Sequence, residues 1–243
     1  GADGIKSKIR NQMLGPQGNH FTGHVAWRGI VPASKLSKGH IPPSANNWLG
    51  PKRHFVSYCI RGGEFINFVA TEERQDWTEE SWSQKGDMTE LRAAFAGWDK
   101  RVTQLLEACE ECYLWGLFDH PPLSTWIDGR VALLGDAAHP MLPFMAQGAS
   151  MAVEDGWVLA QCIKKNKGNP EKALKAYETA RFGRATMIQK MSRENAKLYH
   201  MKSSFQTLIR NIKFKIGTHI PAATHSQLDK VFAANVVKDF PKK

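Results

Sequence analysis

The sequence predicts an α/β protein with α+β character, in which an antiparallel sheet comes first and long helices come last. Three observations support this class: alternating apolar positions over residues 20–70, a run at 130–135 that is apolar after Arg130, and helical patterns after 148. The chain has 243 residues, of which 42% are hydrophobic and 23% charged, so it is long enough for a sizeable core. No apolar run reaches the roughly 18 residues that a membrane helix needs, so no membrane partner is expected.

The predicted sheet comprises three strands. "FTGHVAWRGIVP" (21–32) alternates apolar positions, and "RHFVSYCI" (53–60) and "EFINFVA" (64–70) are joined by "RGG", which is typical of a hairpin. The segment around Trp48 is predicted to be a loop. Residues 20–70 are therefore expected to form an antiparallel sheet.

Helix signals follow the sheet. Asp87 is a predicted N-cap with Glu90 completing a capping box, and "KRVTQLLEACEE" (100–111) has a second helical pattern. After a short strand "YLWGLF" (113–118), "RVALLG" (130–135) is apolar after its first residue, as expected for a strand buried on both faces. Two helices are then predicted, one from about Gly148 to Lys164 and a longer one from about Pro170 to His200.

The four cysteines predict no metal site. Cys109 and Cys112 form a single C-x-x-C, and no second pair or suitably spaced histidines follow it. Reduced structural thiols and a cytoplasmic setting are therefore expected.

The net charge of +10 is concentrated in one stretch. Residues 163–216 hold 14 Lys or Arg and 3 Asp or Glu, whereas the remainder of the chain is close to neutral. This stretch has no zinc-finger, RRM or KH signature. A solvated helical face is favoured over nucleic-acid binding.

Two short motifs carry the chemistry. The first is "GADGIKSKIR" (1–10), and the second is "GDAAHPMLPFMAQGASMAVEDGW" (135–157). Asp136 follows an apolar strand, where ligands gather in open α/β sheets. The small residues at the start of the next helix allow a planar group to approach the free N–H groups there.

Together these motifs resemble the DG and GD motifs of the flavoprotein aromatic hydroxylases, in the branch of salicylate hydroxylase and 3-hydroxybenzoate 6-hydroxylase. The resemblance covers residues 1 to about 200. The family's N-terminal G-x-G-x-x-G unit is not in this sequence, so the chain resembles the C-terminal portion of such an enzyme. The resemblance implies part of an FAD-binding doubly wound fold. It also predicts four segments: 1–19 and 121–165 of the FAD-binding domain, a substrate-binding sheet domain at 20–120, and a helical region at 166–243.

The resemblance implies FAD as cofactor, NADH or NADPH as co-substrate, and hydroxylation of a phenolic acid with O2. It assigns Asp136 to the cofactor's hydroxyl groups, and Asp3 and Gly4 to its pyrophosphate region with Arg10 as a basic partner. The positive end of the helix dipole at Gly148 suits the negative edge of the reduced ring. The full predicted set of cofactor contacts is Gly135, Asp136, Pro143, Gly148, Ala149, Ser150, Asp3, Gly4 and Arg10.

His54 and Tyr58 are the predicted catalytic pair, with Gln147. The alternatives are a structural role for His54 in the sheet and His24, on the first strand, as the base. Residues four apart on a strand share a face, so both side chains are expected to point the same way. The resemblance puts that sheet over the substrate, where a His with a near-neutral pKa suits removal of the phenolic proton. Gln147 is expected to orient substrate or flavin; an ordinary solvated residue before the helix is the alternative.

Two alternatives stay open at this stage. The missing G-x-G-x-x-G and the basic stretch also suit a flavin-less remnant or a basic interaction module. The same fold also supports epoxidation or decarboxylative hydroxylation. Association into a homodimer is compatible with either function.

Overall fold

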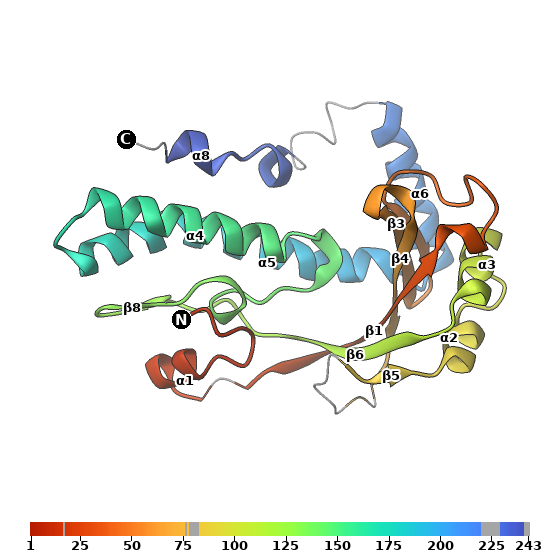
Figure 1. Cartoon of the computed structure of the whole chain (residues 1–243), viewed down its shortest axis with the longest axis horizontal. Helices are drawn as coiled ribbons and strands as arrows, with labels where there is room; N and C mark the ends of the chain where they lie inside the picture. Colours follow the sequence, from red (N-terminus) through yellow and green to blue (C-terminus); the bar gives the residue numbers. More distant parts are fainter. Residues whose placement is uncertain (17, 76, 78–82, 220–228, 241–243) are drawn as a thin grey trace. The chain divides into compact units, whose positions relative to one another are not determined.

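The computed structural model describes residues 1–16, 18–75, 77, 83–219 and 229–240 (Figure 1). Contacts between residues divide the chain into two compact units. The first, the helical unit, comprises residues 1–20, 119–198 and 207–243, and the second, the sheet unit, comprises 21–118 and 199–206. Each unit is therefore built from segments far apart in the sequence.

The sheet unit is organised around six strands in the order β2-β3-β4-β1-β6-β5. The pairs β1–β4, β2–β3, β3–β4 and β5–β6 are antiparallel, which confirms the antiparallel sheet predicted for residues 20–70. The strands are β1 (His20–Pro32), β2 (Asn46–Gly50), β3 (Arg53–Ile60), β4 (Phe65–Glu73), β5 (Lys85–Gly86) and β6 (Cys112–Asp119). The expected loop around Trp48 is wrong, because Asn46–Gly50 pairs with β3 over its whole length.

Aromatic side chains fill the core of the sheet unit. Trp27, Phe55 and Phe68 are fully buried, and the rings of Phe55 and Phe68 stack with centroids 5.2 Å apart. Two helices, α2 (Met88–Ala94) and α3 (Lys100–Ala108), pack against this core. Burying one such aromatic side chain contributes about 1.5–3 kcal/mol. Short 3-10 turns at Ala33–Lys35 (η1) and Arg61–Gly63 (η2) follow β1 and β3.

The caps of these helices follow the local sequence. Asp87 accepts hydrogen bonds from the backbone N–H groups of Thr89 and Glu90, as its N-cap prediction requires. The second helix ends at Ala108, three residues before the expected Glu111, because Cys109 is already extended. Asp99 caps its start.

The helical unit contains two long helices that run alongside each other, α4 (Gly148–Lys165) and α5 (Pro170–Tyr199) (Figure 1). Both agree with the predicted helices to within one or two residues. The shorter helices are α1 (Lys8–Leu14), α6 (Ser204–His219) and α8 (Val236–Asp239). Among the described residues, no helix combines the length and the apolar character that crossing a membrane requires.

The apolar run "RVALLG" forms much less strand than expected. Only Val131–Ala132 (β8) is a strand, and it pairs with Ile127–Asp128 (β7) as a tight antiparallel hairpin. Val131 is 41% exposed, so the prediction of a strand buried on both faces is wrong for this segment. Ala132 and Leu133 are buried, and the backbone carbonyl of Leu133 accepts a hydrogen bond from the buried Tyr177 hydroxyl at 3.1 Å.

Candidate functional site

The GD motif folds as two short 3-10 turns that lead into α4. The turns are η3 (Gly135–Ala137) and η4 (Pro143–Met145). Gly135 has φ +59°, and a Cβ there would lie 3.2 Å from the Cβ of Ala152 on α4. This position needs glycine for both reasons, because a side chain would be strained by φ and crowded by the helix.

Asp136 and the start of α4 carry the cofactor contacts predicted from the sequence, and those roles stay predictions. The Asp136 side chain is exposed between buried neighbours, and partial desolvation raises the pKa of its carboxyl. In the described structure, Gln147 at the helix N-cap makes no side-chain capping hydrogen bond. Gly148 has open space at its Cβ position apart from Met141 Cγ at 3.8 Å. The first N–H groups of α4 are thus placed to meet a planar or anionic group.

The DG motif forms the start of α1. The Asp3 carboxylate accepts hydrogen bonds from the Ser7 hydroxyl at 2.6 Å and from the Lys8 backbone N–H at 2.8 Å. The Ser7 bond, against a smaller effect of burial, lowers the pKa of Asp3. Gly4 has φ +78°, which permits the turn before the helix. Asp3 therefore organises this turn, and its predicted role toward pyrophosphate stays a prediction.

Arg10 joins the two motifs. Its side chain is buried and donates to the carbonyl of Ala137 at 3.1 Å and to the carbonyl of Ile5 at 2.5 Å. The backbone of Gly1 also bonds to Ala132 and Leu134 in the segment before Asp136. Segments more than 120 residues apart are therefore held side by side, as expected if both serve one ligand.

A buried ionic cluster behind the GD turn was missed by the sequence reasoning. Asp155 on α4 accepts hydrogen bonds from the Gly135 backbone N–H at 3.0 Å and from Arg181 Nε at 2.8 Å, and pairs with His139 Nε2 at 2.6 Å. All three side chains are at most 1% exposed. The available signal was an acid on the apolar face of α4, in line with Met151, Val158 and Cys162.

His54 is buried in the sheet unit next to a second histidine. Its Nδ1 lies 2.6 Å from Nε2 of His200, and His54 is 2% exposed. Burial first, and then the neighbouring His24, lower the pKa of His54 to about 3. The near-neutral pKa that the sequence reasoning assumed for this base is therefore wrong in this structure, and the ring is neutral at physiological pH. Burial and His54 likewise lower the pKa of His200 to about 2.

The remaining predicted site residues lie on surfaces. Tyr58 is 39% exposed, four residues beyond His54 on β3, where its register partner on β4 is Asn67. In the helical unit, Pro143 opens η4, and the exposed Ala149 and Ser150 form the first turn of α4. His54 and Tyr58 thus belong to one unit, and the predicted cofactor contacts with Gln147 to the other.

Several arginines of the basic stretch are used inside the helical unit. Arg181 pairs with Asp155 and with Glu154, and Arg184 also pairs with Glu154. Arg193 Nε lies 2.5 Å from Asp119 Oδ2, and Arg210 donates to a backbone carbonyl. These side chains stabilise the fold and reduce the charge that a nucleic acid would meet.

Comparison with known proteins identifies the family. A family model described as an FAD binding domain matches residues 1–192. The chain belongs to this FAD-binding domain family. The matched residues include both motifs and the helices α4 and most of α5.

Curated relatives are aromatic-ring monooxygenases by name. The chain is 39% identical over 211 residues to a 3-amino-4-hydroxybenzoate 2-monooxygenase of Streptomyces platensis, an alignment that covers 87% of this chain and 53% of the relative. It is 36% identical to the 3-hydroxybenzoate 6-hydroxylase of Polaromonas naphthalenivorans, over 97% of this chain and 58% of the relative. The chain thus spans a little over half the length of these relatives.

Solved structures show the same fold. A salicylate hydroxylase in complex with substrate superposes with a TM-score of 0.79 at 29% identity, covering 97% of this chain and 61% of that chain. Klebsiella pneumoniae HpxO complexed with FAD and uric acid gives a TM-score of 0.79 at 26% identity, over 94% of this chain and 59% of that chain. The mixed architecture predicted from the sequence is therefore confirmed at the level of the fold.

The residues present fit an FAD. Gly148 leaves space at the first turn of α4, and the Asp136 carboxylate is exposed in the turn that Gly135 ties to this helix. These features offer an acceptor for hydroxyl groups and N–H donors for an electron-rich ring edge. They account for only part of a dinucleotide site, since the G-x-G-x-x-G pattern is not in this sequence.

Proposed function

We propose that this chain is the C-terminal portion of an FAD-dependent monooxygenase that hydroxylates a phenolic aromatic acid with NADH or NADPH and O2. The observation that carries the proposal is the joining of the DG and GD motifs by Arg10 beside an exposed Asp136 and the start of α4. The family match and the names of the relatives support the same reaction class.

On the flavin side, Asp136 is proposed to accept hydrogen bonds from the ribityl or ribose hydroxyls. The N–H groups of Gly148, Ala149 and Ser150 would stabilise negative charge on the ring, because they lie at the positive end of the α4 dipole. Arg10 and Asp3 keep the two motif turns in place. The bound flavin supplies the redox chemistry and the activation of oxygen, and the protein supplies placement.

On the substrate side, His54 is proposed to take the phenolic proton, because its imidazole is neutral and can accept a hydrogen bond from the phenol. Its pKa of about 3 makes it a weaker base than an ordinary histidine. Removing that proton makes the ring electron-rich and ready for oxygen transfer. Tyr58 and Gln147 are proposed to orient the substrate by hydrogen bonds. A salicylate- or hydroxybenzoate-like acid is the proposed substrate, in line with what the relatives act on by name.

The setting of the reaction is proposed to be the cytoplasm. All four cysteines are free thiols, and three of them are buried, as expected for a reducing compartment. We also propose that the protein forms a homodimer, which a measurement of its mass in solution would test.

The first experiment measures FAD binding to the purified chain by absorbance and by quenching of flavin fluorescence. Because the chain holds only part of a dinucleotide site, weak binding is expected. Asp136→Ala is expected to weaken it further by about tenfold, which corresponds to about 1.4 kcal/mol for a lost charge-assisted hydrogen bond. The matched control is Asp128→Ala, since Asp128 is exposed in the β7–β8 hairpin. Equal binding by both variants would reject the assigned role of Asp136.

The second experiment measures NADH and NADPH oxidation by the FAD-loaded protein with a panel of phenolic acids. Oxidation stimulated by one acid, with a product heavier by one oxygen atom in mass spectrometry, is the expected result. A protein that stays colourless with excess FAD and shows salt-dependent nucleic-acid binding instead would support the basic-module alternative.

A further inference from the structure

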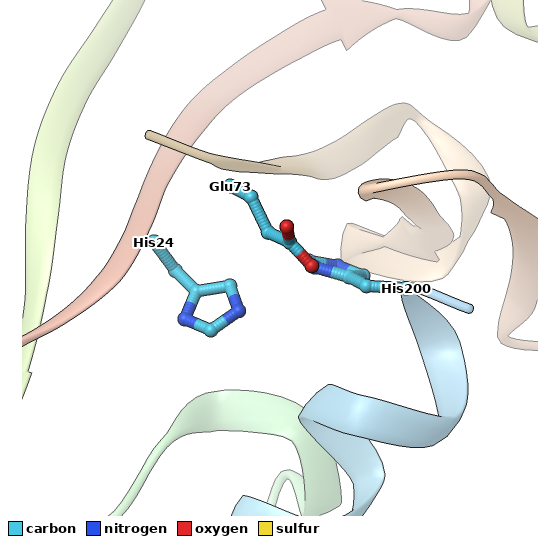
Figure 2. Close-up of side chains that lie close together, drawn as sticks. All are labelled: His24, Glu73 and His200. Atoms are coloured by element: carbon cyan, nitrogen blue, oxygen red, sulfur yellow. The ribbon is translucent and has the colours of Figure 1, made fainter. Parts of the chain in front are cut away.

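Three donor side chains from distant parts of the sequence converge in the sheet unit. His24 on β1, Glu73 at the end of β4 and His200 each offer a ligand atom, and these atoms all lie within 4.8 Å of one another. Figure 2 shows the His24 ring facing the Glu73 carboxylate and the ring of His200. No spacing rule applied to the sequence could find this group, because the residues are separated by 49 and 127 positions.

The backbone holds all three residues in place. His24 and Glu73 are direct partners in the antiparallel ladder between β1 and β4, which sets their side chains close together. The carbonyl of His200 accepts a hydrogen bond from Lys52, and the carbonyl of Lys52 accepts one from Glu73. The cluster is therefore built on strand register and on a backbone chain, with little dependence on side-chain mobility.

The hydrogen bonds of the two histidines select which nitrogens face the cluster. The Thr22 hydroxyl donates to the carbonyl of Leu117 at 2.8 Å, so its oxygen accepts from His24 Nδ1, 3.3 Å away. This tautomer presents the lone pair of His24 Nε2. His200 Nε2 is bonded to His54, and His200 Nδ1 lies 3.8 Å from Glu73 Oε1, which makes Nδ1 the proposed ligand atom. Such outer contacts are the usual way in which metal-binding histidines are oriented.

We propose that His24, Glu73 and His200 bind one divalent transition-metal ion of the Zn²⁺ type. Two imidazoles and one carboxylate are a donor set that zinc accepts with a fourth, open position. Bonds of about 2.0–2.2 Å in tetrahedral geometry put donor atoms about 3.4 Å apart. The present donor atoms lie within 4.8 Å of one another, so binding requires them to approach by up to about 1.4 Å through rotation of Glu73 and of the two imidazole rings.

Lys202 opposes this ion and so provides a specific test. Its Nζ lies 2.8 Å from Glu73 Oε2, so only Oε1 is directed toward His200. The ammonium group repels a bound cation. Removing its charge by Lys202→Met is expected to tighten metal binding several-fold, an effect that general destabilisation of the unit would not produce.

A metal here would also affect the proposed base. His200 is the hydrogen-bond partner of His54, and a metal on His200 Nδ1 fixes the other nitrogen as a donor to His54. We expect Zn²⁺ to inhibit the hydroxylation, a consequence that rests on the proposed function, whereas metal binding itself does not.

The experiment uses the whole chain, stripped of metal with a chelator and titrated with Zn²⁺ by calorimetry and by competition with a chromophoric chelator. One ion per chain is expected. His24→Gln and Glu73→Gln are expected to weaken binding by about tenfold or more, and Lys202→Met to strengthen it. His40→Gln is the control, because His40 lies in the same unit with its Nε2 on the backbone carbonyl of Arg101. Circular dichroism checks that each variant is folded.

Co²⁺ separates this site from the cysteines. Binding to His and Glu gives the weak visible bands of tetrahedral Co²⁺, whereas thiolate ligands add an intense charge-transfer band in the near ultraviolet. Binding that survives both His24→Gln and Glu73→Gln, or that disappears only when the cysteines are alkylated, would overturn the proposal. If the phenolic acid stimulates NAD(P)H oxidation and added Zn²⁺ leaves that rate unchanged, only the predicted inhibition is overturned. If the parent protein binds Zn²⁺ but shows no oxidation with any phenolic acid, the proposed function is rejected and the metal site is not.

Discussion

The backbone N–H of Gly135 donates to the Asp155 carboxylate at 3.0 Å, and this bond ties the GD turn to the middle of α4. The same carboxylate bonds to His139 and Arg181, so one buried acid supports the turn, the segment after it and α5. Because Asp136 directly follows Gly135, the hydrogen bond from Gly135 to Asp155 also helps to fix the position of the exposed Asp136.

Asp155→Asn is expected to lower the free energy of unfolding by about 3 kcal/mol. The substitution removes the buried negative charge that pairs with Arg181. Glu154 still pairs with Arg181, so the buried guanidinium loses one of its two carboxylate partners and keeps the other. Urea denaturation followed by circular dichroism measures the change. Asp128→Asn, on the exposed hairpin, is the control and should stay within about 0.5 kcal/mol of the parent protein. A loss below 1 kcal/mol for Asp155→Asn would show that the cluster contributes little to stability.

Gly135→Ala and Gly129→Ala separate two costs of a side chain. Both glycines have positive φ, +59° and +52°, but only the Gly135 position is crowded, with Ala152 Cβ 3.2 Å from an added Cβ. Gly129→Ala should cost about 1 kcal/mol from the backbone alone, and Gly135→Ala about 2–3 kcal/mol because packing strain adds to it. Thermal or urea denaturation of the two variants tests the difference. Equal losses would mean that α4 shifts to accept the methyl group.

The stability of the chain is expected to fall as the pH drops from about 6.5 toward 4. Burial, and next the charge of Arg10, lower the pKa of His120 to about 4, below its ordinary value of 6.5. The unfolded chain therefore binds a proton in this window that the folded chain does not, and this favours unfolding as the pH falls. The charged or titratable groups around His120 are Arg10, Asp119, His20 and Arg193.

His120→Gln should reduce this dependence by up to about 1.4 kcal/mol per pH unit between pH 6 and 4.5. His40→Gln is the matched histidine control, since the ring Nε2 of His40 bonds to the backbone carbonyl of Arg101. The measurement is a series of urea titrations across that pH range. An unchanged slope in His120→Gln would mean that other groups, such as His54, account for the whole effect.

Local signals predicted the elements that depend on a few neighbouring residues. The Asp87 cap, the hairpin between β3 and β4 and the start of α4 at Gly148 all agree with the structure. The strand β2 was missed because its residues become a strand only by pairing with β3. The length of the strand at "RVALLG" was overestimated. An apolar composition indicates that a segment is buried, but it does not indicate whether a partner strand is available to pair with it.

The same division applies to the candidate site. The motif residues around Asp136 and Gly148 could be found because they are contiguous in sequence. His200 and Asp155 could not be assigned, since their importance comes from partners 146 and 16–26 residues away. The pKa of His54 also depends on burial, which no local pattern reports.

His54→Asn is expected to lower kcat of the FAD-loaded enzyme by about 10²–10⁴, as for loss of a general base. FAD binding should be unchanged, since His54 belongs to the sheet unit and the predicted flavin contacts to the helical unit. Initial rates of product formation test this, with His40→Gln as the matched control. Raising the pH should partly restore the variant if the missing step is removal of the phenolic proton. A normal kcat in His54→Asn would reject the base assignment.

The buried thiols are expected to resist alkylation in the folded chain. Burial raises the pKa of Cys112 to about 11, with Cys109 as the next cause, and burial also raises the pKa values of Cys109 and Cys162. At pH 8 only about one thousandth of Cys112 is then thiolate, the form that reacts. Cys59 is half-buried and should react first with iodoacetamide. Peptide mapping by mass spectrometry gives the rate at each site.

Cys59→Ser should remove the fast phase, and urea should make the remaining thiols react. Rapid alkylation of Cys109 or Cys112 in the folded protein, or a disulfide between them, would contradict their assignment as structural thiols.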